Sequence, residues 1–287
     1  MRPLEKEILK TLAYTDIFDY PLTKPQIWRF LIKNTWSWSQ FNKTLERLKQ
    51  KKYIRKIDTY YLLYGRQKII QLRRQREQVA HTKIAYGQKI SRLLKFIPTV
   101  WFIGISGALA MHNAPHDDDI DFFTICAPGT VWLTRFLATT LLDILKLRRK
   151  PGIGKWQNKI CLNMFMDAAD MALKKSERNL YTAHEVVQLL LLFDRHQTYE
   201  RFLHENRWTR RYLPNASHVP KKETLVPLKV WWKLVFPIET IFYFLQLLYM
   251  KKRITTEQLS RTVIRFHPKD IKVWVLEEYK KRVSTLS

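Results

Sequence analysis

The sequence predicts an α/β (α+β) fold, with a small mixed sheet in the middle of the chain and helices before and after it. Strand-like apolar runs extend from Trp101 to the Ser106-Gly107 turn, over Ile120–Ile125 and over Ile160–Met166. Apolar residues at helical spacing fill the flanking segments. With 287 residues, of which 46% are hydrophobic, the chain is long enough for two or three modules.

The apolar spacing and the capping residues of residues 1–65 predict three helices and a hairpin, an arrangement typical of a winged helix. The helical stretches are Ile8–Leu12, the segment after Pro25, and Phe41–Leu48 with Ser39 as the N-cap. Two short β-favouring runs follow around residues 57–59. The third helix carries basic side chains that can follow a phosphate backbone, namely Lys43, Arg47, Lys49, Lys51 and Lys52. The alternatives are a protein-contact or spacer module and an ordinary solvated helix face.

Residues 66–97 predict one long connecting helix, because apolar residues recur at spacings of three or four and no proline interrupts them before Pro98. We expect Arg73, Arg74 and Arg76 to lie on the face turned away from the apolar stripe. The stripe itself is expected to pack on a core formed by residues 98–178.

The segment 101–126 carries the chemistry. The turn Ser106-Gly107-Ala108 ends a strand and is expected to open a short helix over Ala108–His112, where free N–H groups can receive a phosphate. Asp119 and Asp121 then fall on one face of the next strand, because strand side chains alternate. Paired carboxylates suit Mg²⁺. The alternatives are a solvated Asp-rich turn beside a tight loop and the metal-binding DxD of glycosyltransferases, which lacks such a turn at this distance.

This arrangement resembles the nucleotidyltransferase superfamily typified by DNA polymerase β, whose members have an apolar strand, a Gly-Ser or Gly-Gly turn, and then apolar-Asp-apolar-Asp-apolar. Here the interval from Gly107 to Asp119 is 12 residues (119 − 107). The whole chain also resembles uncharacterised bacterial nucleotidyltransferase-domain proteins with an N-terminal winged-helix-like segment. The resemblance implies a polymerase-β-type sheet, Mg²⁺ or Mn²⁺ bound by Asp119 and Asp121, and NTP phosphates held at Ser106, Gly107 and Ala108. Ala108 stands where the family usually has Ser or Gly.

Active members add a third carboxylate from a later strand, and this chain has no clear equivalent. The centre of the run Ile160–Met166 is Asn163, which is a neutral ligand and cannot act as a base. Asp167 shares its face but stands at the end of the strand. We therefore expect Asn163 or Asp167 as the third ligand, or else a site in which nucleotide binding has outlived transfer chemistry.

The net charge of +26, from 51 Lys and Arg against 25 Asp and Glu, predicts a polyanionic partner such as RNA or DNA; the alternative is a generally basic proteome. Two cysteines and an N-terminus without an apolar leader predict a reducing, cytoplasmic location. The segment Val230–Met250 is too interrupted by Lys233, Pro237 and Glu239 to span a membrane, so a buried or interfacial helix is expected.

Residues 179–287 predict a helical C-terminal region, with helices over Asn179–Trp208 and Thr255–Val283 and a Pro-bearing linker from Leu213 to Pro227. The resemblance implies a metal-dependent nucleotidyltransferase that moves a nucleotidyl group from an NTP to an acceptor hydroxyl, with nucleic acid as one candidate acceptor. Two alternatives remain. One is a non-catalytic protein that senses nucleotides or binds nucleic acid through a degenerate site. The other is a membrane-surface protein that binds near Trp231 and Trp232.

Overall fold

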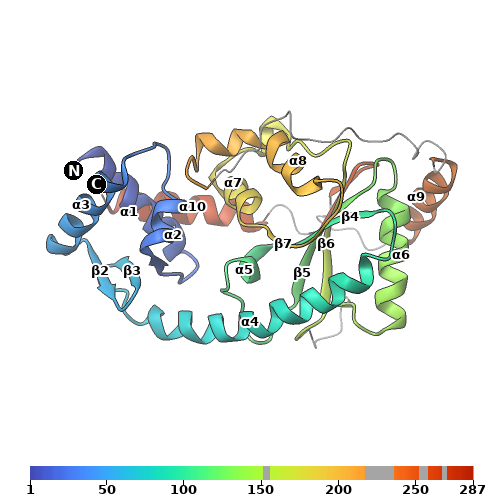
Figure 1. Ribbon diagram of the computed structural model, residues 1–287, viewed down its shortest axis with the longest axis horizontal. Coiled ribbons are helices and arrows are strands. Elements are labelled where there is room, and N and C mark those ends of the chain that lie inside the picture. The colour runs from blue at the N-terminus through green and yellow to red at the C-terminus, as the bar shows by residue number, and fades with distance from the viewer. Residues whose placement is uncertain (151–155, 217–235, 252–257, 267–269, 287) are drawn as a thin grey trace.

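The computed structural model describes residues 1–150, 156–216, 236–251, 258–266 and 270–286. The molecule is elongated, with a small helical unit at one end, a mixed sheet with its helices at the other, and a long helix running beneath both (Figure 1). Both chain termini lie at the end formed by the helical unit.

The N-terminal unit contains the three helices and the hairpin that the sequence predicts. Its elements are α1 (Pro3–Asp16), β1 (Leu22–Thr23), α2 (Lys24–Arg29), α3 (Trp38–Gln50), β2 (Ile54–Ile57) and β3 (Tyr60–Leu63). The three short strands pair antiparallel in the order β1-β3-β2. The N-cap of α3 is Ser37 rather than Ser39, because the Ser37 hydroxyl accepts a hydrogen bond from the Gln40 amide and the Gln40 side chain bonds back to the Ser37 amide.

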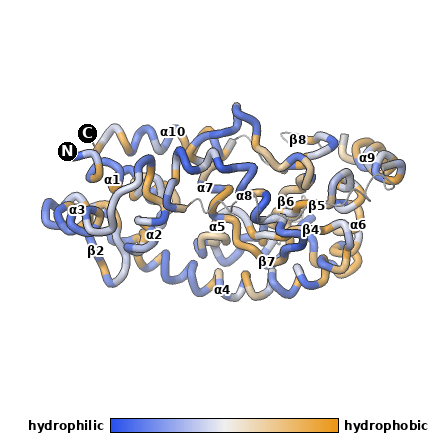
Figure 2. Tube along the Cα trace, turned by 45° about the horizontal axis from the view of Figure 1, so that its top comes forward, coloured by the Kyte–Doolittle hydropathy of each residue, from blue (hydrophilic) through white to orange (hydrophobic). Residues whose placement is uncertain are grey.

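Helix α4 (Ile69–Leu94) connects the two ends of the molecule, as the sequence predicts. Hydrophobic and hydrophilic residues alternate along it (Figure 2), and its apolar side includes the buried Ala80, Ile90 and Leu94. Gly87 brings the helix close to the sheet, because a Cβ at this position would lie 3.3 Å from a methyl of Ile105.

One expectation for α4 is wrong, since Arg73 is only 2% exposed and does not face solvent. Its guanidinium lies 4.0 Å from the centre of the Tyr20 ring and donates hydrogen bonds to the carbonyls of Met111 and His112. These contacts stabilise a buried cation, and they join the N-terminal unit to the segment that follows α5.

The larger sheet has the strand order β7-β4-β5-β6-β9-β8. Strands β4 and β5 are antiparallel, β5 and β6 are parallel, and β6 and β9 are antiparallel. The sheet is therefore mixed, as expected. Its strands, with the two helices that follow β4 and β5, are β4 (Val100–Ile105), α5 (Gly107–Ala110), β5 (Ile120–Cys126), α6 (Val131–Ile144), β6 (Ile160–Asp167), β7 (Leu190–Asp194), β8 (Gln258–Leu259) and β9 (Val263–Arg265).

Two apolar clusters cover the two faces of this sheet. On one face, Ile103, Ile105 and Phe122 pack with residues of α4, α6 and α9 (Phe236–Lys251). On the other face, Phe102, Phe123 and other residues pack with α7 (Leu180–Val187), α8 (Thr198–Glu205) and α10 (Asp270–Ser284). Alternating side chains of the same strands thus enter two separate cores, which holds the strands rigidly in place.

The C-terminal half is not entirely helical, and this corrects the sequence prediction. The run expected to be one helix from Asn179 to Trp208 instead forms α7, then β7, then α8, and it ends in a short 3₁₀ turn at Arg207–Arg211. The expected helix over Thr255–Val283 is replaced in its described part by the β8–β9 hairpin and α10. Strand β7 forms because the apolar run at residues 189–193 can pair with the free edge of β4, whereas periodicity alone does not distinguish such a run from a helix.

The segment considered for membrane contact is described only in part, as α9, and residues 230–235 lie outside the described residues, as does most of the expected linker Leu213–Pro227. In the described residues, no helix combines the length and the apolar character that crossing a bilayer requires. Helix α9 does expose a row of large apolar side chains, namely Ile238, Ile241, Phe244, Leu245, Leu248 and Tyr249.

Candidate metal centre

The turn between β4 and α5 lies directly against the carboxylate of Asp121. The Ser106 amide donates a 3.0 Å hydrogen bond to the Asp121 carbonyl. Gly107 has a φ of +67°, and a Cβ there would lie 3.5 Å from Asp121 Oδ2. Glycine therefore satisfies two needs at this position, a left-handed backbone and a close approach to the carboxylate.

The helix after this turn is shorter than expected and spans only Gly107–Ala110 instead of Ala108–His112. Four residues form a single turn, so the contribution of a helix dipole is small and the donors of the turn must be individual N–H groups. Ser106 is 8% exposed, and its buried hydroxyl has no hydrogen-bond partner among the described residues. Buried hydroxyl groups without partners are uncommon and call for an explanation.

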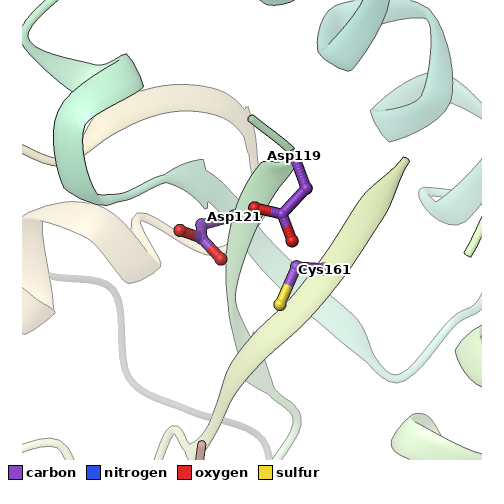
Figure 3. A group of neighbouring side chains, drawn as sticks. All are labelled: Asp119, Asp121 and Cys161. Carbon is purple, nitrogen blue, oxygen red and sulfur yellow. The ribbon is translucent and has the colours of Figure 1, made fainter. Parts of the chain in front are cut away.

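Asp119, Asp121 and Cys161 form one group, in which the carboxylate oxygens and the thiol sulfur all lie within 4.8 Å of one another. Figure 3 shows the three side chains converging, with Asp119 just before β5, Asp121 on β5 and Cys161 on the adjacent strand β6. Asp121 and Cys161 are direct partners in the parallel pairing of the two strands. The two aspartates that the sequence singles out are therefore brought together, and a thiol joins them.

The electrostatics of the group are those of two carboxylates that share a site with little water. Burial and, to a smaller extent, the neighbouring Asp119 carboxylate together raise the pKa of Asp121 to about 7. Burial also raises the pKa of the Cys161 thiol well above its usual range, and the negative charge of Asp121 adds to that effect. Without a cation, Asp121 is therefore partly protonated at neutral pH and Cys161 is a neutral thiol.

Two cationic side chains already lie beside this group. The Arg149 guanidinium makes a 2.7 Å ion pair with Asp119, from Nη1 to Oδ2, and lies 4.2 Å from the centre of the Trp156 ring. Lys83 of α4 is 2% exposed and donates a hydrogen bond to the carbonyl of Asp118. Burial lowers the pKa of Lys83, and the adjacent aspartates oppose that effect.

Asp167 lies at the other end of the β5–β6 pair from Asp119 and Asp121. It pairs in register with Cys126, five residues beyond Asp121 on β5, which corresponds to about 16 Å along the strand. Its two carboxylate oxygens each accept a 2.7 Å hydrogen bond, one from the Gly129 amide and one from the Ala169 amide. Asp167 therefore secures two loops and lies away from Asp119 and Asp121 in this structure.

Asn163 lies on β6 two residues after Cys161 and is half-buried. The β5–β6 pairing is irregular between Asp121 and Phe123, so β6 carries one more residue than β5 in this stretch. The residue directly beside Asp121 is therefore Cys161. The sequence does not indicate that Cys161 belongs to this group, because its place depends on the strand register, which the sequence alone does not reveal.

The basic side chains of α3 and the residues after it are largely paired within the N-terminal unit. Arg47 makes a 2.7 Å ion pair with Glu5, Lys51 lies 3.7 Å from the same carboxylate, and Lys49 pairs with Glu46. Their charges are partly neutralised, which weakens this surface as a track for a phosphate backbone.

Asp119, Asp121, the Ser106-Gly107 turn and Cys161 thus form a compact anionic site on the rigid β4–β5–β6 part of the sheet. Comparison with known proteins gives no match for this chain, since no family model, no curated protein and no solved structure resembles it significantly.

Proposed function

We propose that this protein is a metal-dependent nucleotidyltransferase that transfers a nucleotidyl group from an NTP to an acceptor hydroxyl. The single observation that carries the proposal is the convergence of Asp119 and Asp121, at the start of β5, beside the Gly107 turn that follows β4. The order β4-α5-β5-α6-β6, with β4 antiparallel and β6 parallel to β5, supports a polymerase-β-type assignment for the sheet.

The donor set fits a divalent cation. Two carboxylates offer oxygen ligands of the kind that Mg²⁺ and Mn²⁺ prefer, and a bound cation would oppose the rise in the pKa of Asp121 that burial and Asp119 cause. A cation held by Asp119 and Asp121 would neutralise phosphate charge during transfer. The thiol of Cys161 is a softer ligand than a third carboxylate and favours Mn²⁺ over Mg²⁺.

In the proposed reaction, the chain positions the nucleotide and the acceptor for in-line attack. The turn at Ser106–Ala108 supplies backbone donors and the unpartnered Ser106 hydroxyl to the phosphates. The acceptor oxygen forms a bond to the α-phosphorus, the bond from that phosphorus to the bridging oxygen breaks, and pyrophosphate leaves. The proton of the acceptor hydroxyl passes to water. Positioning and charge neutralisation supply most of the rate in such reactions.

A second candidate function is a non-catalytic protein that senses nucleotides or binds nucleic acid. The observation in its favour is that Cys161, a neutral thiol in the free site, joins Asp119 and Asp121 in the described residues, whereas active members of the resembled superfamily have a third carboxylate. The net charge of +26 suits a nucleic acid partner under either proposal.

The deciding experiment is label transfer from each α-labelled NTP with Mg²⁺ or Mn²⁺, using total cellular RNA, DNA and protein as acceptors. We expect transfer by the wild type and a loss of at least about 10²-fold in Asp119→Asn and Asp121→Asn. Asp117→Asn is the matched control, because Asp117 is exposed and lies outside the Asp119–Asp121–Cys161 group. Absence of transfer by a folded wild type that still binds NTP would favour the sensor.

A further inference from the structure

Arg149 holds the Asp119 carboxylate in the free protein. Its Nη1 lies 2.7 Å from Asp119 Oδ2, and its guanidinium stacks at 4.2 Å on the Trp156 ring. The Arg149 amide donates a 2.9 Å hydrogen bond to the Ile160 carbonyl, which fixes the backbone next to the start of β6 and one residue from Cys161. The residue is thus anchored at its backbone beside the proposed metal ligands.

Under the proposed function, the Asp119 carboxylate binds a divalent cation, whereas in the free protein it binds Arg149. Asp119 is 6% exposed, so its charge is costly to leave without a partner, and Arg149 supplies that partner when no metal is present. A divalent cation at Asp119 would repel the guanidinium at this short distance. Binding of the metal therefore weakens the Arg149–Asp119 ion pair, and the ion pair in turn weakens binding of the metal.

Arg149 can move without losing all of its support. Its side chain is 25% exposed, whereas that of Asp119 is 5% exposed, so solvent borders the arginine side of the pair. A guanidinium offers five N–H donors in a planar fork that matches a phosphate as well as a carboxylate. The anion that arrives together with the metal at this site, under the proposed function, is the triphosphate of a nucleotide.

We propose that Arg149 is an exchangeable counter-ion, which neutralises Asp119 in the free site and transfers to a phosphate of the nucleotide when a divalent cation occupies Asp119. The inference rests on the proposed function and adds a regulatory property to it. Metal alone binds weakly because it must displace Arg149, and nucleotide and metal bind cooperatively because the displaced arginine gains a new partner. Such coupling is reciprocal for the two ligands.

The chain supplies a matched control in the preceding residue. Arg148 makes a two-pronged ion pair with Asp143, at 2.9 and 2.8 Å, and touches neither Asp119 nor Asp121 in the described structure. Arg148→Gln and Arg149→Gln remove the same charge from adjacent positions. A general effect of net charge on metal binding would appear equally in both variants.

The first measurement is the binding of Mn²⁺ without nucleotide, followed through the paramagnetic resonance signal of the free ion. We expect Arg149→Gln to bind Mn²⁺ about tenfold more tightly than the wild type and Arg148→Gln to differ by less than about twofold. Trp156→Ala removes the stacking partner without changing any charge and should shift affinity in the same direction as Arg149→Gln. It provides the test if Arg149→Gln does not fold.

The second measurement is the binding of a triphosphate analogue with a methylene in place of the α–β bridging oxygen, at saturating Mn²⁺. We expect Arg149→Gln to bind it about tenfold more weakly than the wild type, so that one substitution strengthens binding of the metal and weakens binding of the nucleotide. Equal or weaker Mn²⁺ binding by the variant would overturn the counter-ion role, and unchanged analogue affinity would overturn the transfer to phosphate. If the wild type binds no analogue while Arg149→Gln still binds Mn²⁺ more tightly, the proposed function and the phosphate step fail but the counter-ion role stands.

Discussion

Asp121 and Cys161 lie side by side as register partners on the parallel strands β5 and β6, with their ligand atoms within 4.8 Å of each other and of Asp119. The third potential ligand in this group is therefore a thiol, which under the proposed function lies beside the bound metal. Hard cations prefer oxygen, whereas sulfur favours softer divalent ions, so this one position is expected to control the metal preference of the site.

The first prediction concerns Cys161. In Cys161→Asp, transfer with Mg²⁺ should rise relative to transfer with Mn²⁺ by about tenfold, equivalent to about 1.4 kcal/mol of differential stabilisation. Rates measured with each metal at saturating NTP give the ratio directly. Cys161→Ser is the control, because it removes the sulfur without adding a charge. A ratio that is the same in the wild type and in Cys161→Asp would show that residue 161 does not contact the metal.

The second prediction concerns the stability of the metal-free site. The pKa of Asp121 is about 7 in the folded protein, against 3.8 for an unperturbed aspartate, so the unfolded state loses its proton first as the pH rises. The free energy of unfolding should therefore fall between about pH 4 and pH 7, by at most about 4 kcal/mol, and stay lower above pH 7. Asp121→Asn should remove this loss.

Urea unfolding of the wild type and Asp121→Asn in the presence of a chelator, at pH 5 and pH 8, measures this effect. The variant should be more stable than the wild type at pH 8, with a smaller difference at pH 5, although it loses transfer. Asp117→Asn, at an exposed position, should show neither change. A lower stability of Asp121→Asn than of the wild type at pH 8 would contradict this prediction. It would show that the Asp121 carboxylate stabilises the metal-free fold.

The third prediction concerns Asp167, which we expect to contribute to stability and not to transfer. Its carboxylate accepts hydrogen bonds from the Gly129 and Ala169 amides and joins the ends of β5 and β6. Asp167→Ala leaves two amide groups without their acceptor, so we expect a loss of roughly 2–4 kcal/mol in the free energy of unfolding. Transfer per folded molecule at low temperature should remain within about threefold of the wild type. A loss of transfer comparable to that of Asp119→Asn would show that Asp167 acts at the metal centre.

The parts of the fold that the sequence predicts well are those set by local pattern. The β4 run, the glycine turn and the Asp pair lie within 26 residues, and alternation along a strand suffices to place Asp119 and Asp121 together. The helices of the N-terminal unit likewise follow from spacing and caps. Even here the choice between Ser37 and Ser39 as the cap depends on which hydroxyl meets the Gln40 amide.

The parts that the sequence predicts poorly depend on pairing between distant segments. Cys161 enters the site through the register of β6 against β5, and β7 forms because β4 has a free edge for an apolar run that otherwise suits a helix. Arg73 is buried because Tyr20 and the carbonyls after α5 surround it, and nothing in the helix itself indicates those partners. Such contacts become visible only when the tertiary structure is known.

The last prediction concerns acid stability and His184, a buried histidine of α7. His184 is 1% exposed, stacks on Tyr14 with ring centres 4.1 Å apart, and accepts a 2.8 Å hydrogen bond at Nδ1 from the Gln188 side chain. Its Nε2 has no partner among the described residues. Burial lowers the pKa of His184 to about 3, so the folded state holds the ring neutral far below its ordinary pKa of 6.5.

Because the pKa of His184 is lower in the folded state than in the unfolded state, the unfolded state gains the proton first as the pH falls. The contribution of neutral His184 to stability is therefore complete above about pH 6.5 and is lost as the pH falls toward 3. The loss at pH 4.5 should be about 2–3 kcal/mol, from two pH units at 1.36 kcal/mol each.

His184→Phe retains a ring that can stack on Tyr14 and cannot titrate. Its stability at pH 7.5 should be about 1 kcal/mol lower, because the Gln188 side chain loses its acceptor. Between pH 7.5 and pH 4.5 it should lose about 2–3 kcal/mol less than the wild type, as measured by urea unfolding at both pH values. Parallel losses in the two proteins would show that other groups, and not His184, set the acid sensitivity of this core.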